Sequence, residues 1–394
     1  MEKPDIDKQL EIIKRGAVDI ISEKELKTKL QESIKSKRPL NIKAGFDPTT
    51  ADIHLGHTVL LRKLRQFQDL GHRVIFLIGD FTARIGDPSG RQEARKPLTK
   101  EEAIGNAATY KNQVSKILDT DNIRVVFNSE WFDSMSVLEI LKLTTHATVS
   151  QMLARSDFKK RLSKGDEVSL LEFMYPLLQG YDSVKLEADI ELGGTDQIFN
   201  LLVGRDMQKD FGQQQQAVIT MPLLEGTDGV QKMSKSYGNY IAINDSPKDM
   251  FGKIMSISDE MMLKYYTLLT DEDLEAVKKI HPKEAKSNLA ENITRQYHGR
   301  EAAEKARREF EDVFSKGELP EELPVYKLKK EGSSIIDILL DSGLTLSRNE
   351  ARRLIQQGGV SLDGKRLDKE DTFIDKEGTL KAGKRRFLRL IKEK

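Results

Sequence analysis

The chain has 394 residues and no cysteine, and its 64 basic and 63 acidic side chains give a net charge of +1. This balance predicts no global attraction to nucleic acid, so any RNA contact must come from local patches. The lack of cysteine excludes disulfides, thiol nucleophiles and thiolate metal sites. No apolar run approaches the ~18 residues of a membrane span, and the first residues form no apolar signal core, so we expect a cytoplasmic protein.

The first 245 residues alternate between helical and strand-like patterns. A helical pattern over 7–35 is followed by predicted strands at 40–44, 73–79, 123–127, 188–192 and 217–221, with predicted helices at 58–70, 100–118, 168–181 and 196–211. This alternation predicts an α/β fold with a Rossmann-like doubly wound parallel sheet. Ligands of such sheets bind at the carboxyl ends of the strands. A helical stretch at 134–165 interrupts the alternation.

The remainder of the chain predicts two further parts. From 246 the pattern is helical and rich in Lys and Glu, and a turn-rich stretch with Pro320 and Pro324 reads as a linker. Short helices and strands then occupy 332–394, where fourteen Lys and Arg against ten Asp and Glu give a net charge of +4. We therefore expect a catalytic domain at 1–245, a helical domain at 246–325 and a small α+β domain at 332–394.

The first chemistry-bearing segment is GFDPTTADIHLGH, from Gly45 to His57. A predicted strand ends in a glycine turn, and a helix begins near His54 and His57, which share a face because they are three residues apart. Gly56 would let a flat nucleotide base approach the backbone, and a helix N-terminus favours phosphates. The histidine spacing alone is equally compatible with a metal pair or with two surface histidines.

The second segment is KMSKS, which begins at Lys232 in a polar loop. Two lysines flanked by serines on a loop can clamp phosphates, although many lysine-rich loops are merely solvated. About 175 residues of alternating α/β pattern separate the two segments. That arrangement is far more specific than either segment alone.

Together HLGH and KMSKS resemble the two signatures of class I aminoacyl-tRNA synthetases, with Leu55 where the family often has isoleucine. GFDPT, GDPSGR (86–91), YPLLQGYD (175–182) and GGTDQ (193–197) resemble bacterial tyrosyl-tRNA synthetases, and the resemblance covers nearly the whole chain. It implies a tyrosine–tRNA ligase. Such an enzyme activates L-tyrosine with ATP, giving tyrosyl-adenylate and pyrophosphate, and then transfers the tyrosyl group to the 3′ end of tRNA(Tyr). Mg²⁺ is expected to enter with ATP and pyrophosphate, with no metal site in the protein.

The resemblance assigns roles residue by residue. The implied catalytic residues are Thr49, His54, His57, Arg91, Arg95, Lys232 and Lys235. Of these, His57 matches a position that holds the adenosine and the others match positions that contact the phosphates; Arg91 stands where the family often has lysine. The implied ATP site holds the adenosine and phosphates and comprises Asp47, His54, Gly56, His57, Lys232, Met233, Ser234 and Lys235. In the implied tyrosine site, the α-ammonium is received by Asp87, Tyr175 and Gln179, the phenolic hydroxyl by Asp182, and the carboxylate and pocket wall lie near Gln197 and Asn128.

Tyr175, Gln179 and Asp182 fall at positions i, i+4 and i+7, so one helix face can contact both ends of tyrosine. An ordinary helix surface is the alternative for Tyr175 and Gln179. Many relatives carry a tyrosine two residues before the glycine of GFDPT, where it donates to the substrate hydroxyl. Lys43 occupies that position here. It either pairs with Asp182 or turns away, and the sequence leaves both open.

The segment 343–360 resembles the S4 RNA-binding fold. Ser347 is the expected helix N-cap with Glu350 completing a capping box. The RNA-binding side chains share the surface of this helix and are Arg348, Arg352 and Arg353, and a solvated helix is the alternative. The helical stretch at 134–165 resembles the family's dimer-forming segment, so we also expect a homodimer.

Two other functions remain open from the sequence. One is a tryptophan-specific synthetase of the same subclass, against which Asp182 and the Y-x-x-x-Q-x-x-D face argue because they suit a phenol. The other is a non-catalytic RNA-binding protein on a degenerate scaffold, against which the intact His54, His57, Lys232 and Lys235 argue.

Overall fold

The computed structural model describes residues 4–48, 53–87, 98–315, 323–328, 332–345, 347–383 and 386–392. The chain forms two compact units, Met1–Arg307 and Arg308–Lys394. Across the described ranges, no helix is long and apolar enough to cross a membrane.

A six-stranded sheet forms the centre of the first unit, in the order β1-β6-β5-β2-β3-β4. Its parallel strands are β2 (Asn41–Phe46), β3 (Arg73–Ile78), β4 (Ile123–Phe127), β5 (Ile190–Gly194) and β6 (Ala217–Met221). Five of the six residues of β3 and all of β6 are buried, as expected for strands covered on both faces. The predicted doubly wound parallel sheet is therefore confirmed.

The edge strand β1 (Asp19–Ile21) corrects the helical prediction for 7–35. It pairs antiparallel with β6 and separates α1 (Ile6–Lys14) from α2 (Glu23–Ser36). The backbone of Gly16 is left-handed, with φ of 73°, which ends the first helix. Ser22 begins the second helix with a complete capping box to Glu25. Both signals were present in the sequence, but the charged helical pattern around them obscured the short strand.

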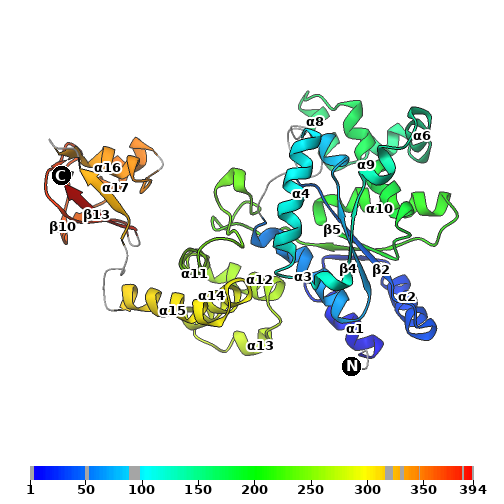
Figure 1. Ribbon diagram of the computed structural model, residues 1–394, viewed down its shortest axis with the longest axis horizontal. Helices are drawn as coiled ribbons and strands as arrows, with labels where there is room; N and C mark the ends of the chain where they lie inside the picture. Colours follow the sequence, from blue (N-terminus) through cyan, green and yellow to red (C-terminus); the bar gives the residue numbers. More distant parts are fainter. Residues whose placement is uncertain are drawn as a thin grey trace. The chain divides into compact units, whose positions relative to one another are not determined.

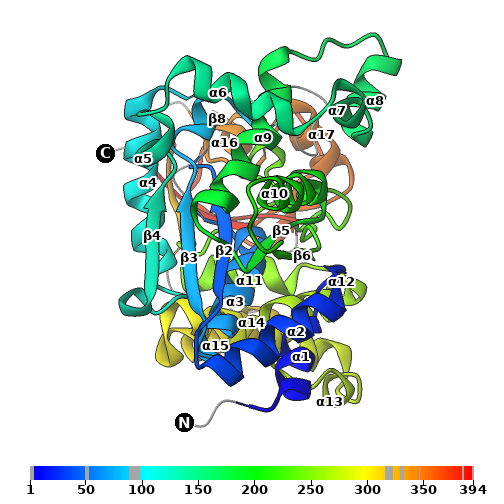
Figure 2. The same cartoon turned by 90° about the vertical axis from the view of Figure 1, so that its right-hand side faces the viewer.

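Helices cover both faces of this sheet (Figures 1 and 2). The helix α3 (Leu55–Asp69) packs on β2, β3 and β5, while α9 (Leu170–Lys185) and α10 (Ile198–Asp210) lie side by side on the opposite face. The other helices before β5 are α4 (Lys100–Val114), α5 (Ser129–Phe132), α6 (Val137–Leu143), α7 (Val149–Leu153) and α8 (Ser156–Ser163). The short 3₁₀ turns are η1 (Thr82–Arg84), η2 (Thr120–Asn122), η3 (Thr144–His146), η4 (Thr195–Gln197) and η5 (Lys235–Tyr237).

The strand order locates the ligand crevice. From β2 the chain builds outward through β3 and β4, and it then returns to build β5 and β6 on the other side of β2. Crossover helices at such a switch point lie on opposite faces, which opens a crevice at the carboxyl ends of the strands. The segments that follow β2, β3 and β5 therefore line the candidate site.

The chain continues after the sheet with helices, as the sequence predicts. They are α11 (Pro247–Met255), α12 (Asp259–Leu269), α13 (Leu274–Val277), α14 (Pro282–His298) and α15 (Arg300–Ser315). The hydroxyl of Tyr265 on α12 donates to the backbone oxygen of Glu225 at 2.7 Å. This bond ties the helices to the loop that carries KMSKS.

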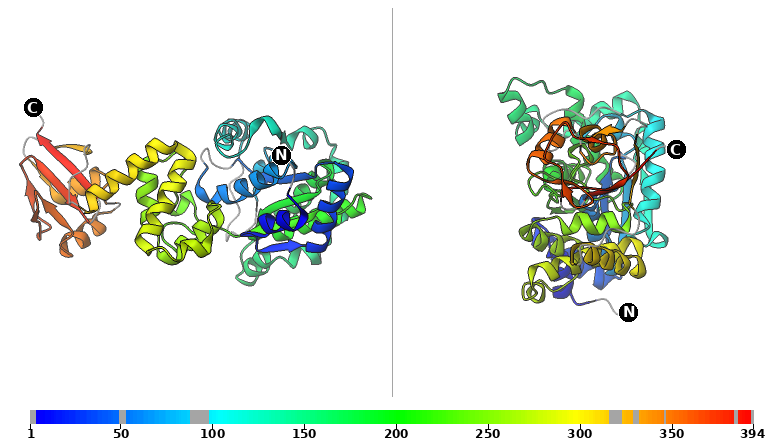
Figure 3. Two further views of the ribbon diagram at one scale, coloured as in Figure 1. Left: turned by 90° about the horizontal axis from the view of Figure 1, so that it is seen from below. Right: turned by 90° about the vertical axis from the view of Figure 1, so that its left-hand side faces the viewer.

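The second unit is a small α+β fold with its own core (Figure 3). Its main sheet has the order β10-β9-β12-β13-β7, and α16 (Ile335–Asp341) and α17 (Arg348–Gln356) pack against it through Ile338, Leu339 and Ile355. The strands are β7 (Val325–Leu328), β9 (Val360–Leu362), β10 (Lys365–Arg366), β12 (Gly378–Ala382) and β13 (Arg386–Lys392), beside a separate pair of β8 (Ser333–Ser334) and β11 (Phe373–Ile374). Because β7 pairs in parallel with β13, this unit includes the residues just after Pro324.

Candidate active site

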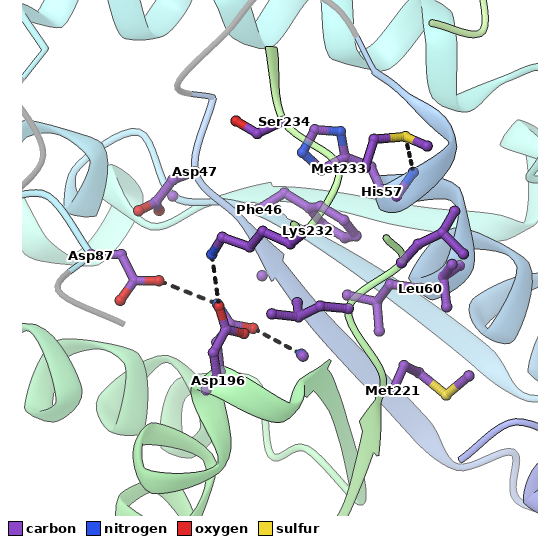
Figure 4. A pocket seen from close by; sticks show the side chains of 18 of the residues that line it. Phe46, Asp47, His57, Leu60, Asp87, Asp196, Met221, Lys232, Met233 and Ser234 are labelled. Carbon is purple, nitrogen blue, oxygen red and sulfur yellow. Dashed lines mark hydrogen bonds and ion pairs between the residues drawn. The ribbon is translucent and has the colours of Figure 1, made fainter. Parts of the chain in front are cut away.

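A cavity of about 260 Å³ opens at the carboxyl ends of the central strands. Most of the site residues predicted from the sequence line it, namely Asp47, His54, Gly56, His57, Asp87, Tyr175, Gln179, Asp182, Gln197, Lys232, Met233, Ser234 and Lys235. Figure 4 shows how the loop with Lys232 and Met233 faces the carboxylates across this cavity. Thr49, Arg91 and Arg95 lie outside the described residues.

The two signature histidines lie at the start of α3. His54 is its N-cap residue, and the His54 and His57 rings stack with centroids 3.8 Å apart. The backbone N–H of His54 donates to Nδ1 of His57 at 3.3 Å. A Cβ on Gly56 would come within 3.0 Å of the His54 ring and 3.4 Å of Met233 Cβ, so a side chain there would crowd both signatures.

Burial, together with the charge of Lys235, lowers the pKa of His54 to about 4. His54 is therefore a neutral imidazole at neutral pH, with one N–H donor and no charge. Positive charge in this part of the cavity comes from lysines instead. Among the described residues, no group of three or more histidine, cysteine or carboxylate side chains could hold a metal ion.

The KMSKS loop is held across the cavity mouth. Lys232 Nζ lies 3.4 Å from Asp196 Oδ2, a contact visible in Figure 4. Buried Asn239 donates to Asp228 Oδ2 at 2.8 Å and to the Lys232 carbonyl at 3.2 Å, and it accepts from the Ser234 N–H at 2.8 Å. Asp196 and Asn239 were not among the predicted site residues, although Asp196 lies within GGTDQ.

Tyr175, Gln179 and Asp182 all face the cavity from α9. The Tyr175 hydroxyl donates to Asp47 Oδ2 at 2.7 Å, and Thr82 Oγ1 donates to Asp47 Oδ1 at 2.8 Å. Asp47, assigned to the adenosine by the resemblance, is thus also joined to the tyrosine-binding face. Gly79 leaves room for the Asp47 carboxylate, because a Cβ there would lie 2.2 Å from Asp47 Oδ1.

Asp182 is a buried carboxylate with two side-chain donors. Trp131 Nε1–H donates to Oδ1 at 3.0 Å, and Asn128 Nδ2 donates to Oδ2 at 3.4 Å. Burial raises the pKa of Asp182 to about 7, although the Lys43 charge and the two donors act in the opposite direction. Trp131, the chain's one tryptophan, was missed because only its position in the fold brings it to Asp182.

Lys43 does not pair with Asp182. Its ammonium is buried and donates to Glu191 Oε1 at 2.9 Å, to Ser183 Oγ at 2.8 Å and to the Gln179 carbonyl at 3.1 Å. All three donor hydrogens therefore have partners behind the cavity wall. Glu191 was not predicted as a partner because it lies on β5, well separated in sequence from β2.

The remaining predicted side chains are Gln197, which lines the cavity, and those of α17 in the second unit. Gln197 Nε2 donates to Asp87 Oδ2 at 3.4 Å. In the second unit, Ser347 caps α17 through a bond from the Glu350 N–H at 3.2 Å, while the Glu350 carboxylate lies 3.6 Å from Arg386. The exposed arginines of α17 are Arg348, Arg352 and Arg353. Arg348 and Arg352 pair with surface carboxylates, and such exposed pairs are weak.

Comparison with known proteins first defines a class. Residues 35–315 match the family of tRNA synthetases class I (W and Y), and residues 315–388 match the Tyrosine–tRNA ligase SYY-like C-terminal domain. A curated Tyrosine–tRNA ligase of Oleidesulfovibrio alaskensis is 54% identical and covers 98% of this chain and 99% of its own. Another from Thermotoga maritima is 50% identical, covering 98% and 97%. The chain therefore belongs to the tyrosine–tRNA ligase family.

Solved structures agree in fold. The crystal structure of tyrosyl-tRNA synthetase complexed with L-tyrosine from Archaeoglobus fulgidus has a TM-score of 0.62 at 24% identity, covering 77% of this chain and 100% of its own. A C-terminally truncated mitochondrial tyrosyl-tRNA synthetase of Aspergillus nidulans has a TM-score of 0.64 at 22% identity, covering 80% and 95%. At these identities the likeness shows the fold alone.

Proposed function

We propose that the cavity catalyses the tyrosine–tRNA ligase reaction, activating L-tyrosine with ATP and passing the tyrosyl group to tRNA(Tyr). One observation carries the proposal at the level of the site. The cavity has a buried carboxylate, Asp182, in one wall, and two histidines and two lysines from the signature segments around another part of it. A phenolic hydroxyl needs a hydrogen-bond acceptor, whereas a triphosphate needs donors and positive charge. This cavity has an acceptor in Asp182 and donors in the histidines and lysines.

In the first step, an oxygen of the tyrosine carboxylate attacks the α-phosphorus of ATP. The bond from that phosphorus to the bridging oxygen breaks, and pyrophosphate leaves with the bonding electron pair. In the second step, a ribose hydroxyl of the terminal tRNA adenosine attacks the carbonyl carbon and releases AMP. No side chain has to act as a nucleophile, so catalysis comes from positioning and from donors that bind the phosphates most tightly in the transition state.

The phosphate end uses neutral and charged donors together. Neutral His54 can donate one N–H to a phosphate oxygen, and Lys232 and Lys235 offset the charge that develops on pyrophosphate. The ion pair between Lys232 and Asp196, at 3.4 Å, has to break when Lys232 binds the phosphates. Thr49, Arg91 and Arg95 are proposed to join them, by the resemblance. Mg²⁺ is proposed to enter as part of the ATP substrate, held largely by the phosphates.

Side chains in the tyrosine-binding part of the cavity bind both the hydroxyl and the α-ammonium of the amino acid. Asp182 accepts from the phenolic hydroxyl, while Asp87, Tyr175 and Gln179 receive the α-ammonium. A buried acceptor left without its hydroxyl partner is unfavourable, so kcat/KM for phenylalanine is expected to be roughly 10⁴–10⁵-fold lower than for tyrosine. This hydroxyl recognition favours tyrosine over tryptophan.

We further propose a cytoplasmic homodimer. Large apolar side chains stand exposed on the helices within 134–165, among them Val137 at 76%, and Leu170 at the start of α9 is 81% exposed. Large apolar side chains exposed along one segment of the chain suit a subunit interface. The arginines on α17 are proposed to contact tRNA phosphates in an S4-like manner.

The proposal is tested by amino-acid-dependent exchange of labelled pyrophosphate into ATP. We expect exchange with L-tyrosine and none with tryptophan or phenylalanine. Exchange driven by tryptophan would assign the site to the other branch of the family. Binding of tRNA without any exchange would indicate a non-catalytic scaffold.

A further inference from the structure

A buried chain of hydrogen bonds leads from Gln179 into the protein. Gln179 lines the cavity. Its Nε2 donates to Glu191 Oε1 at 3.1 Å, and its Oε1 accepts from Asn200 Nδ2 at 2.9 Å. Asn200 Oδ1 in turn accepts from Arg155 Nη1 at 2.9 Å. Gln179 is the one member of this chain of four that lines the cavity; the others are buried behind it.

The two ends of this chain have opposite chemistry. Glu191 is a carboxylate that accepts from Lys43, Gln179, Ser183 and Gln216, so donors in the protein surround it. Arg155 is a guanidinium, which can only donate. A chain that starts at an acceptor and ends at a donor fixes the direction of both amides between them.

Turning over the Gln179 amide would break both of its bonds. Its oxygen would then face the Glu191 carboxylate, and its NH₂ group would face the NH₂ of Asn200, which Arg155 holds in place. The bonding partners therefore determine the orientation of the amide, which diffraction often leaves ambiguous. They engage Nε2 with Glu191, and they leave Oε1, which accepts one bond from Asn200, as the amide atom able to accept a second bond from a ligand.

Arg155 is itself firmly held. Its Nε and Nη2 donate to the two carboxylate oxygens of Asp157 at 3.0 and 2.8 Å. Its guanidinium lies over the Phe158 ring, 4.5 Å from the centroid, and 5.3 Å from the centroid of Phe199. Paired and stacked guanidinium groups are rigid anchors.

We propose that the Lys43–Glu191 pair and the Arg155–Asn200 pair are positioning residues, which keep Gln179 Oε1 oriented to accept from the amino group of bound tyrosine. This inference rests on the proposed function. Lys43 thus has a different role from the tyrosine it replaces. It neutralises the carboxylate that orients Gln179, and it does not contact the phenol.

The test compares two ligands that differ only at the amino group, L-tyrosine and 3-(4-hydroxyphenyl)propionate. Calorimetry gives both dissociation constants for the wild type and for two variants. Lys43→Met/Glu191→Gln removes a buried ion pair as a unit, which avoids an unpaired buried charge. Asn200→Leu removes the donor to Gln179 Oε1 and keeps the same branched arrangement of heavy atoms. A Gln179 side chain that must be ordered on binding weakens its ligand by about two- to tenfold.

We expect each variant to weaken tyrosine by that factor and to leave the des-amino ligand unchanged. The tyrosine KM in pyrophosphate exchange should rise by the same factor at unchanged kcat. The matched control is Arg161→Met/Glu172→Gln, which removes another buried ion pair anchored on α9 but outside the chain to Gln179. Its ligand ratio should stay at the wild-type value.

Two results overturn the inference. One is an unchanged ligand ratio in variants that fold by circular dichroism, and the other is an equal loss for both ligands. Asn200→Leu carries no charge change, so it decides the question if the double variant does not fold. Failure of the proposed function is distinguishable, because the wild type itself would then show no tyrosine-dependent exchange.

Discussion

The charge of Asp182 destabilises the folded protein, so a substitution that removes this charge should raise the free energy of unfolding. Its carboxylate is buried, and burial raises its pKa from 3.8 to about 7. The folded protein must therefore hold a poorly solvated charge in the cavity wall once the pH rises above about 7. Asp182→Asn keeps the shape of the side chain and removes the charge.

The magnitude follows from the pKa shift. Roughly three pKa units at about 1.4 kcal/mol each amount to about 4 kcal/mol. Because the folded-state pKa lies above the unfolded one, the folded state binds more protons between about pH 4 and pH 7, and stability falls as pH rises through that window. The amide loses its contact with Asn128 Nδ2, at a cost of about 1 kcal/mol. We expect Asp182→Asn to raise the free energy of unfolding by about 3 kcal/mol at pH 8. Near pH 4 the variant should gain nothing and lose up to about 1 kcal/mol, because only the lost contact with Asn128 remains.

The assay is urea unfolding followed by tryptophan fluorescence at pH 4.5, 6 and 8. Trp131 is the chain's one tryptophan and donates to Asp182 at 3.0 Å, so its emission reports on this region. A gain in stability that grows with pH would show that burial raises the pKa of Asp182. A variant that is equally or less stable at pH 8, or a difference that does not change with pH, would show that Asp182 titrates near its ordinary value.

Three further predictions concern catalysis. Asp182→Ala should collapse discrimination between tyrosine and phenylalanine or abolish activity, and full activity with full discrimination in exchange kinetics would contradict its role. His54→Ala and Lys232→Ala should each raise the activation free energy of adenylate formation by about 2–4 kcal/mol, with little effect on tyrosine affinity. Single-turnover kinetics that show only weaker tyrosine binding would contradict this. Truncation after Ser315 should preserve pyrophosphate exchange but strongly weaken salt-sensitive tRNA charging, whereas unchanged charging would show that the removed residues do not serve tRNA.

The parallel sheet could be predicted because its strands carry their own signal. Buried apolar runs such as RVIFLI in β3 are distinctive by themselves. The strand β1 was missed because three residues between charged helices carry little periodicity. Its stability comes from pairing with β6, a contact distant in sequence.

The candidate site was predictable where one element supplies several side chains. Tyr175, Gln179 and Asp182 lie on one helix, so their spacing placed them together. Contacts between elements were not predictable from spacing. Trp131 reaches Asp182 and Lys43 reaches Glu191 only because the fold brings those elements together. The low pKa of His54 has the same origin, since burial and Lys235 cause it.

We propose that this chain esterifies tyrosine, and no other amino acid, to tRNA. The most direct test incubates the full chain with all twenty amino acids, ATP, Mg²⁺ and total bacterial tRNA. Nuclease then releases the terminal aminoacyl-adenosine, and mass spectrometry identifies the amino acid attached. We predict tyrosyl-adenosine alone, with its yield dependent on ATP. Tryptophanyl-adenosine as the product, or no aminoacyl-adenosine from an enzyme that folds and binds tRNA, would show that the chain is not a tyrosine–tRNA ligase.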